Sequence, residues 1–267
     1  MSPRTFVALV AAGFRRWSAY RQATAASAFT NTVFGFLKVY VLFAVATGAG
    51  GAVAGYDPAM LASYVWFGQG LIGVVMLFTW TDLADRVRTG EVTADLLRPV
   101  DPMWSYLAAD LGRAGHAVLF RLMLPVAVGA VFFDLYAPHR WLSYPLFAAS
   151  VLLAVVVSFA FRYLVNLTAF WLLDVRGAIA LWLVGSTLLS GLAFPIWFLP
   201  DWAQWLLWLG TPFPAMVQGP LDVYIEYADL PGQLLVLADQ ALWVGLGLVL
   251  CRWVQHRAVR KLVIQGG

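Results

Sequence analysis

Apolar residues along this chain collect in long stretches, separated by short polar or Gly- and Pro-rich segments. Each stretch is about 20 residues long, which is the length an α-helix needs to cross the hydrocarbon core of a bilayer. The pattern predicts an all-α protein with six transmembrane helices, at residues 25–47, 59–81, 117–136, 144–172, 177–198 and 232–254. We expect Pro125 to kink the third helix, because proline removes a backbone hydrogen bond and clashes with the preceding turn.

A further helix is predicted ahead of the first span, within residues 1–23. We expect no secretory signal here, because two adjacent arginines interrupt the place where an apolar core is needed. One face is apolar and the other polar: the first consists of Phe6, Leu9, Val10, Phe14 and Trp17, the second of Arg4, Arg15 and Ser18. This pattern is typical of a helix that lies in the membrane interface. The alternative is that these residues are simply the cytoplasmic start of the first span.

Residues 199–231 are too apolar for a solvated loop and too interrupted for a full crossing. Five prolines break the segment, whereas Trp202, Trp205 and Trp208 keep it apolar. Short helices that enter the membrane and return to the same side fit this pattern best, with the tryptophans at headgroup level. We therefore predict re-entrant half-helices on the outer side.

The basic residues are distributed unevenly. No Lys or Arg occurs in residues 39–85 or 177–251, although the chain contains 17 of them. Because Lys and Arg gather on the cytoplasmic side of a bilayer, these two regions are expected to contain the outer loops. Arg140, in a short turn predicted to lie outside, is an exception. We expect a multi-pass protein of a bacterial cytoplasmic membrane, with both termini and the loop 82–102 in the cytoplasm.

The composition limits the function. Hydrophobic residues make up 62% and charged residues 12%, against roughly 45–50% and about 25% in soluble domains. No repeat or linker divides the chain, so residues 1–267 are expected to form one domain. Cys251 is the single cysteine, which excludes an intrachain disulfide. Neither Lys38 nor Lys261 fits a phosphate-binding P-loop. We predict no catalytic residues, cofactor or metal in this chain, and no nucleic-acid partner.

Residues 82–102 form the most polar segment of the chain. It could be a solvated connector between the second and third spans. However, Gly90 lies between charged residues, as at a turn that opens a short helix, and Pro99 and Pro102 follow as rigid stops. The two adjacent leucines between them are expected on one side of this helix. An amphipathic helix with fixed ends suits docking into a groove on a soluble partner. The residues alone leave both interpretations open.

Two motifs resemble permeases of the type-2 ABC transporter family. The first, Arg88-x-Gly90-Glu91-Val92-x-x-Asp95-Leu96-Leu97-Arg98-Pro99, looks like the inner loop of those permeases. The second is similar to their fifth span and outer re-entrant helices, and reads Ser190-Gly191-Leu192-Ala193-Phe194-Pro195-Ile196-Trp197-Phe198-Leu199-Pro200-x-Trp202, with Pro212-Phe213-Pro214 after it. The order of the predicted elements extends the resemblance over essentially the whole chain.

The resemblance implies the permease subunit of an ATP-driven exporter. In that family the permeases form dimers, and a separate ATPase subunit, which binds ATP and Mg, contacts each permease through the loop after the second span. A homodimer and a pair of paralogous permeases are both implied. The ATPase-coupling residues would be Arg86, Arg88, Gly90, Glu91, Leu96, Leu97, Arg98 and Pro99. The outer gate would contain Pro195, Trp197, Pro200, Trp202, Pro212 and Pro214. The rival interpretations are a six-span anchor for a cytoplasmic partner and an intramembrane enzyme.

Charged residues inside predicted spans need a reason, because each costs roughly 2.5–3.5 kcal/mol at a helix centre on insertion scales. Lys38 lies in the first span and Asp239 in the sixth, at matching distances from the outer ends. One hypothesis is an ion pair between these two helices. The other is that Lys38 faces the transport path and contacts an anionic group of the substrate.

Two arginines and a group of small residues allow further expectations. Arg121 and Arg162 lie near the inner boundary, and we expect their side chains to extend to the lipid headgroups. Ser186, Ser190 and Gly191 permit close helix approach in the fifth span. These small residues could form the dimer seam or pack within one chain.

Overall fold

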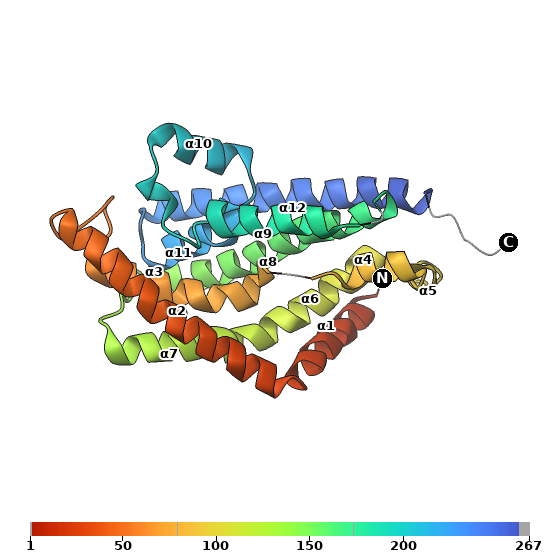
Figure 1. Ribbon diagram of the computed structural model, residues 1–267, viewed down its shortest axis with the longest axis horizontal. Coiled ribbons are helices and arrows are strands. Elements are labelled where there is room, and N and C mark those ends of the chain that lie inside the picture. Colours follow the sequence, from red (N-terminus) through yellow and green to blue (C-terminus); the bar gives the residue numbers. More distant parts are fainter. Residues whose placement is uncertain (1, 79, 173, 262–267) are drawn as a thin grey trace.

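The computed structural model describes residues 2–78, 80–172 and 174–261, where the backbone is helical apart from turns and an isolated bridge between Val53 and Tyr56. Most helices run along one long axis and pack side by side (Figure 1). Within these residues five helices are long and apolar enough to cross a membrane: Arg21–Gly48, Pro58–Met76, Pro102–Phe132, Ser143–Phe170 and Leu230–Val259. An all-α membrane protein is thus confirmed. The predicted span 177–198 differs, because its helix, α9 (Arg176–Leu189), stops at Leu189.

The N-terminal helix α1 (Pro3–Ser18) is separate from α2 (Arg21–Gly48), which matches the predicted first span. The chain changes direction between them, so the two helices form an elbow (Figure 1). Gly13 of α1 and Gly112 of α6 lie at the contact of these two helices, and a methyl group at either position would collide with the facing backbone. The separate N-terminal helix is confirmed, and α1 is not the start of the first span. Its position in the membrane interface stays a prediction.

The second span, α3 (Pro58–Leu71), lies at the centre of the bundle, with most of its side chains buried. Asp57 caps its first turn by accepting a hydrogen bond from the N–H of Met60 at 2.8 Å. The helix continues as a π-helical turn (Ile72–Met76) and ends there, earlier than the predicted residue 81. Met76 has a positive φ of 58°, which turns the chain out of the helix.

The third span consists of α6 (Pro102–Ala117), a π-helical turn (Val118–Leu122) and α7 (Met123–Phe132). The π turn directly precedes Pro125, which has no N–H to donate and whose ring would clash with the carbonyl four residues earlier. The helix bends at this turn (Figure 1), which confirms the predicted kink.

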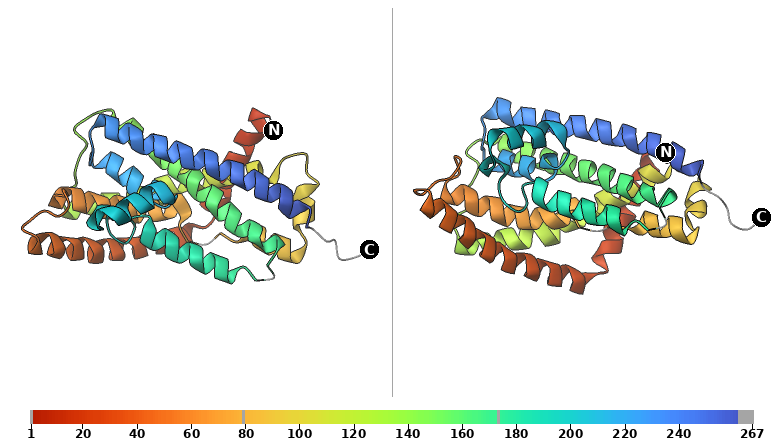
Figure 2. Two further views of the ribbon diagram at one scale, coloured as in Figure 1. Left: turned by 90° about the horizontal axis from the view of Figure 1, so that it is seen from above. Right: turned by 45° about the horizontal axis from the view of Figure 1, so that its top comes forward.

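The fourth and sixth predicted spans lie along one another (Figure 2). They are α8 (Ser143–Leu167), which ends in a 3₁₀ turn (Thr168–Phe170), and α12 (Leu230–Val259). Gly247 of α12 faces Ala160 of α8, so the absence of a side chain lets the two helices approach closely.

Between α9 and α12 the chain forms the short helices predicted there. They are a 3₁₀ turn (Ile196–Phe198), α10 (Asp201–Gly210), a 3₁₀ turn (Pro214–Met216) and α11 (Gln218–Tyr224). Trp202 and Trp205 of α10 are exposed, whereas α11 is buried against α3, α8 and α12. The depth of these helices in the membrane stays a prediction.

The two ends of the molecule differ in character (Figure 1). One end, which we name the charged end, holds α4 (Asp82–Thr89), α5 (Val92–Leu96), the start of α1 and the last turns of α12. The opposite end, which we name the aromatic end, holds α10 and α11. Candidate functional groups lie at both ends.

Candidate functional site

The charged segment, residues 82–101, folds into α4 and α5, which Asp95 holds together. Arg86 donates to both carboxylate oxygens of Asp95, at 2.7 and 3.1 Å, and the hydroxyl of Tyr106 donates at 3.0 Å. Gly90 ends α4 with a φ of 80°, a conformation that favours glycine. Burial opposes the charged form of Arg86, but its contact with Asp95 raises the pKa of Arg86 above the ordinary value. The segment is a folded unit with a fixed shape.

The residues predicted to couple to an ATPase divide into an exposed and an inward-facing group. Those on the surface are Arg88, Gly90, Glu91, Leu97, Arg98 and Pro99. Leu97 is 86% exposed. Arg86 instead holds Asp95, and Leu96 packs against the core cluster that includes Leu83 and Met103. The expectation that both leucines share one side is wrong, because successive residues of a helix point about 100° apart.

Side chains from three neighbouring helices hold the backbone that joins the second span to the charged segment. We name this arrangement the carbonyl ladder: it comprises the carbonyl groups of residues 73, 74, 75, 77 and 80 with their side-chain donors. The donors are Arg113 of α6, Ser158 and Asn166 of α8, and Trp182 and Ser186 of α9, at 2.7 to 3.3 Å. Buried carbonyls that lack helical partners require such donors. Asn166 also accepts from the N–H of Ala84 at 3.1 Å, which fixes the start of α4.

The ladder also decides between the two interpretations of the small residues. Ser186 and Ser190 are fully buried within one chain, and Ser186 donates to the carbonyl of Leu77 at 3.3 Å. Internal packing therefore accounts for them, and the dimer-seam interpretation is not supported.

Beside the ladder, Asp110 of α6 binds two arginines. It accepts from Nε of Arg113 at 2.6 Å and from Nη2 of Arg162 at 2.8 Å. The exposed fractions of the three residues are 8%, 4% and 2%, so this triad has a net positive charge inside the protein. The expectation that Arg162 extends to the headgroups is wrong, because Asp110 offers it a buried partner. The guanidinium of Arg121 lies 5.7 Å from the ring centre of Trp17.

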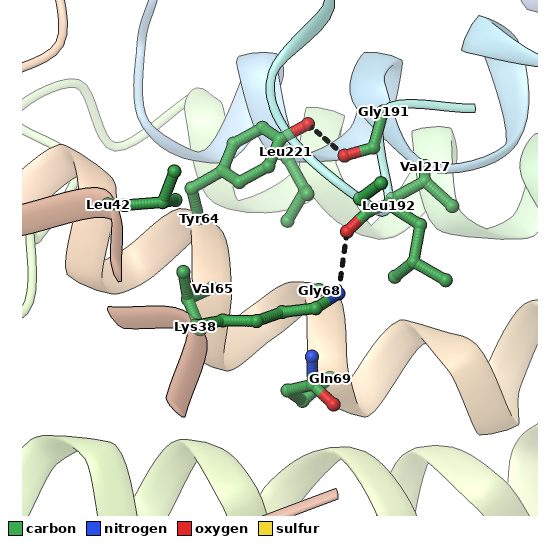
Figure 3. A pocket seen from close by; sticks show the side chains of 11 residues that line it. Lys38, Leu42, Tyr64, Val65, Gly68, Gln69, Gly191, Leu192, Val217 and Leu221 are labelled. Carbon is green, nitrogen blue, oxygen red and sulfur yellow. Dashed lines mark hydrogen bonds between the residues drawn. The ribbon is translucent and has the colours of Figure 1, made fainter. Parts of the chain in front are cut away.

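At the aromatic end the backbone that follows α9 is not helical, and side chains bind its polar groups. Gly191 has a φ of 86°, and its carbonyl accepts from the hydroxyl of Tyr64 at 2.6 Å (Figure 3). The N–H of Gln218 donates to the carbonyl of Ser190 at 2.9 Å. The side-chain oxygen of Gln218 accepts from the N–H of Ile196, also at 2.9 Å. Irregular backbone in apolar surroundings requires partners of this kind.

Asp222 of α11 is the centre of the same polar cluster, and the sequence interpretation missed it. Its carboxylate accepts from the side-chain amide of Gln218 at 2.7 Å, from the indole of Trp197 at 2.8 Å and from the hydroxyl of Tyr56 at 3.1 Å. Asp222 is only 4% exposed. The one available signal was an acidic residue within an apolar, proline-rich segment. Gln218 lies one turn earlier on the same helix, but Tyr56 and Trp197 come from outside α11.

The predicted gate residues are not one cluster. Trp197 binds Asp222 and stacks on Tyr227, with ring centres 5.1 Å apart. The remaining positions differ in exposure: Pro195 and Pro214 are buried, Pro212 is half-buried, and Pro200 and Trp202 are exposed. The structure thus places Trp197 and the buried prolines near the polar cluster and leaves Trp202 on the surface of α10.

Lys38 binds the same non-helical backbone. Its ammonium group donates to the carbonyl of Leu192 at 2.8 Å, in a small pocket between α2, α3 and residues 191–193 (Figure 3). No ion pair among the described residues joins Lys38 to Asp239, and Oδ2 of Asp239 is buried without a hydrogen-bond partner there. The predicted ion pair is therefore wrong. The unwound backbone supplies Lys38 with a carbonyl instead.

Glu226, in the turn between α11 and α12, is a second acidic residue whose role was not predicted from the sequence. One carboxylate oxygen accepts from the hydroxyl of Ser143 at 2.7 Å and the N–H of Arg140 at 2.9 Å. The other accepts from the hydroxyl of Tyr136 at 2.8 Å and the N–H of His139 at 2.9 Å. Burial raises the pKa of this carboxyl, but the hydrogen bonds outweigh burial and lower the pKa to about 2. Glu226 therefore joins the turn at residues 136–143 to the turn between α11 and α12.

Comparison with known proteins identifies the family. No curated protein and no solved structure matches the chain. A family model described as ABC-2 family transporter protein matches residues 29–266. This range contains most of α2, all later helices, the charged segment and the aromatic end. It confirms the resemblance carried by the two sequence motifs, and the chain therefore belongs to the ABC-2 family of transporter proteins.

Proposed function

We propose that this chain is the permease subunit of an ATP-driven exporter and that a separate ATPase subunit drives it through the charged segment. The family and the five membrane-spanning candidates identify a transporter permease. One observation carries the finer proposal. The charged segment is a folded unit with an exposed surface, and the carbonyl ladder attaches it to the membrane helices.

The exposed surface of the segment suits a soluble partner. Leu97 projects from the end of α5, and Glu91 and Arg98 are exposed near it. A large exposed leucine fits an apolar groove, and the flanking charges orient the contact. In this proposal the ATP and Mg are bound by the ATPase subunit, whose closure displaces the charged segment.

The displacement reaches the membrane helices through the carbonyl ladder. Asn166 joins α4 to α8, while Arg113 and Trp182 join the preceding backbone to α6 and α9. Because these contacts are buried and short, α4 moves together with the helices that hold it. Two permeases, identical or paralogous, would then open the path between them alternately to the two sides.

We further infer that α9 belongs to a sixth, broken crossing. Its 14 residues rise roughly 21 Å at about 1.5 Å per residue, which is less than the ~30 Å hydrocarbon core. Residues 190–199 complete the crossing without an α-helix, and Tyr64, Lys38 and Gln218 bind their backbone. Broken helices at membrane depth are typical of transporters. In this arrangement the cluster around Asp222 acts as the outer gate.

The coupling proposal is tested by purifying the tagged chain and measuring the ABC ATPase that accompanies it. We expect Leu97→Asp to lose the ATPase subunit and its ATP hydrolysis. Val259→Asp is the matched control, because Val259 is an exposed apolar residue near the end of α12. Equal ATPase retention by the two variants refutes the docking surface. A wild-type chain that retains a cytoplasmic partner without ATPase activity indicates the anchor function instead.

The predicted sidedness has its own test. Cys251 is buried and is the single cysteine of the chain, so Glu91→Cys combined with Cys251→Ala gives one reactive thiol. A membrane-impermeant maleimide is expected to label it in inverted vesicles only. Labelling in right-side-out vesicles places the charged segment outside and overturns the coupling scheme.

A further inference from the structure

The charged half of the molecule contains an open groove of about 700 Å³ that the transport mechanism above does not use. The groove lies between the elbow of α1 and α2 on one side and the third span, α6 to α7, on the other (Figure 1). We propose that it binds one anionic phospholipid, with the lipid phosphate at Arg21 and an acyl chain along the third span. The proposal requires a membrane location and is independent of the coupling mechanism.

Thr24 is a buried polar side chain in the groove that has no hydrogen-bond partner among the described residues. It is 9% exposed. His116 is 5% exposed, and its ring packs between Phe14 and Phe120 without a hydrogen bond to a described residue. Buried polar groups are almost always hydrogen-bonded. The hydroxyl of Thr24 therefore calls for a ligand with a polar atom at this depth, where His116 also lines the groove.

The charge at the mouth of the groove selects an anion. Arg21, the first residue of α2, lines the groove and forms no ion pair with a described residue. Residues 1–30 contain four basic and no acidic residues, and one of the four, Arg16, pairs with Asp82 at 3.3 Å. A guanidinium group binds a phosphate with two parallel hydrogen bonds. Because the surrounding charge is positive, a headgroup that also contains a cation is disfavoured.

The remainder of the groove matches an acyl chain. Leu119, Met123 and Leu124 line it and are 55%, 47% and 49% exposed, although they lie within a transmembrane helix. From His116 to Ala127 the helix rises roughly 16 Å at about 1.5 Å per residue. That is close to half of the ~30 Å hydrocarbon core, and thus to one leaflet. The length and the apolar wall identify a lipid and not a small soluble anion as the occupant.

Lipid retention by the purified protein tests the proposal. The protein is exchanged into detergent containing equal amounts of phosphatidylglycerol and phosphatidylcholine with identical acyl chains, and bound lipids are counted by native mass spectrometry. We expect one retained phosphatidylglycerol per chain. Arg21→Gln is expected to weaken its retention about tenfold, the factor that corresponds to about 1.4 kcal/mol. Arg15→Gln is the matched control, because Arg15 is exposed on the neighbouring helix outside the groove.

A second pair of variants separates a built site from ordinary lipid around the protein. Ala25→Phe fills the groove, and we expect it to abolish phosphatidylglycerol retention. Ala26 is exposed on the same helix but does not line the groove, so Ala26→Phe should leave phosphatidylglycerol retention unchanged. Equal retention of both lipids by the wild type overturns the proposal. So does an equal loss in the two arginine variants, or unchanged binding in Ala25→Phe.

Discussion

For the buried triad of Asp110, Arg113 and Arg162, charge alone predicts which of two variants is the more stable. Asp110→Asn keeps the size of the side chain but leaves two guanidinium groups without their shared carboxylate. Arg162→Met instead removes the excess positive charge and retains the pair between Asp110 and Arg113 at 2.6 Å. Arg113 then still donates to the carbonyls of residues 73 and 74. The second variant should therefore be the milder one.

The magnitudes follow from these contacts. Removal of one partner from a buried ion pair costs roughly 3–5 kcal/mol, and Asp110→Asn belongs in this range because both arginines lose the same acceptor. Arg162→Met loses the contacts of one guanidinium, while methionine fills much of its volume, so we expect about 1–2 kcal/mol. The double variant leaves a single unpaired arginine. It is expected to be more stable than Asp110→Asn alone.

The buried thiol of Cys251 provides the assay. It is 0% exposed and is the single cysteine of the chain, so a thiol-reactive fluorophore labels the protein only when the bundle opens. Labelling across a denaturant series in detergent yields the free energy of unfolding for each variant. The charge argument fails if Arg162→Met is destabilised as much as Asp110→Asn. It also fails if the double variant is the least stable of the three.

Three further predictions concern other contacts. The folded pKa of Glu226, about 2, lies below the unfolded value of about 4.3, so its stabilisation is present above pH 4.3 and is lost as the pH falls toward 2. Glu226→Gln should flatten this pH dependence of unfolding and cost about 1–3 kcal/mol at pH 7; an unchanged slope contradicts the assignment. Replacing Glu91 and Arg98 together by Ala should abolish the permease's effect on ATP hydrolysis while membrane insertion is retained, and unaltered coupling removes these residues from the contact. Gly112→Ala should force α1 away from α6 and lower the free energy of unfolding by about 1–3 kcal/mol. Gly245 faces open space, so Gly245→Ala should not lower the free energy of unfolding in the same thiol-labelling assay.

The membrane helices could be predicted because a local property defines them. A run of about 20 apolar residues specifies a span without reference to the remainder of the chain, and α2, α3, α8 and α12 follow that rule. The kink at Pro125 was equally local. The end of α9 was not local, because residues 190–195 stay non-helical only with partners from Tyr64 and Gln218. These residues lie elsewhere in the sequence, and no local sequence pattern predicts their contacts.

The charged residues illustrate the same limit. Equal depth made Lys38 and Asp239 plausible partners, but depth along a helix says nothing about the direction in which each side chain points. Arg162 was expected at the headgroups because its partner, Asp110, is 52 residues away in the sequence. In the charged segment the short helix expected after Gly90 is present as α5. Which of Leu96 and Leu97 faces outward depended on how α5 rests on the core.

The carbonyl ladder has a consequence for how this transporter can diversify. Insertion or deletion of one residue between positions 73 and 80 would shift the carbonyls that follow it relative to their donors on α6, α8 or α9, so the length of this connection is fixed. The exposed side chains of Arg88, Glu91, Leu97, Arg98 and Pro99 carry no such constraint. Gly90 is held by its backbone conformation, and Val92, Asp95 and Leu96 by their contacts. Under the proposed coupling, exchange of this short surface between relatives should redirect the chain to a different ATPase subunit, while grafts with junctions inside the ladder should misassemble.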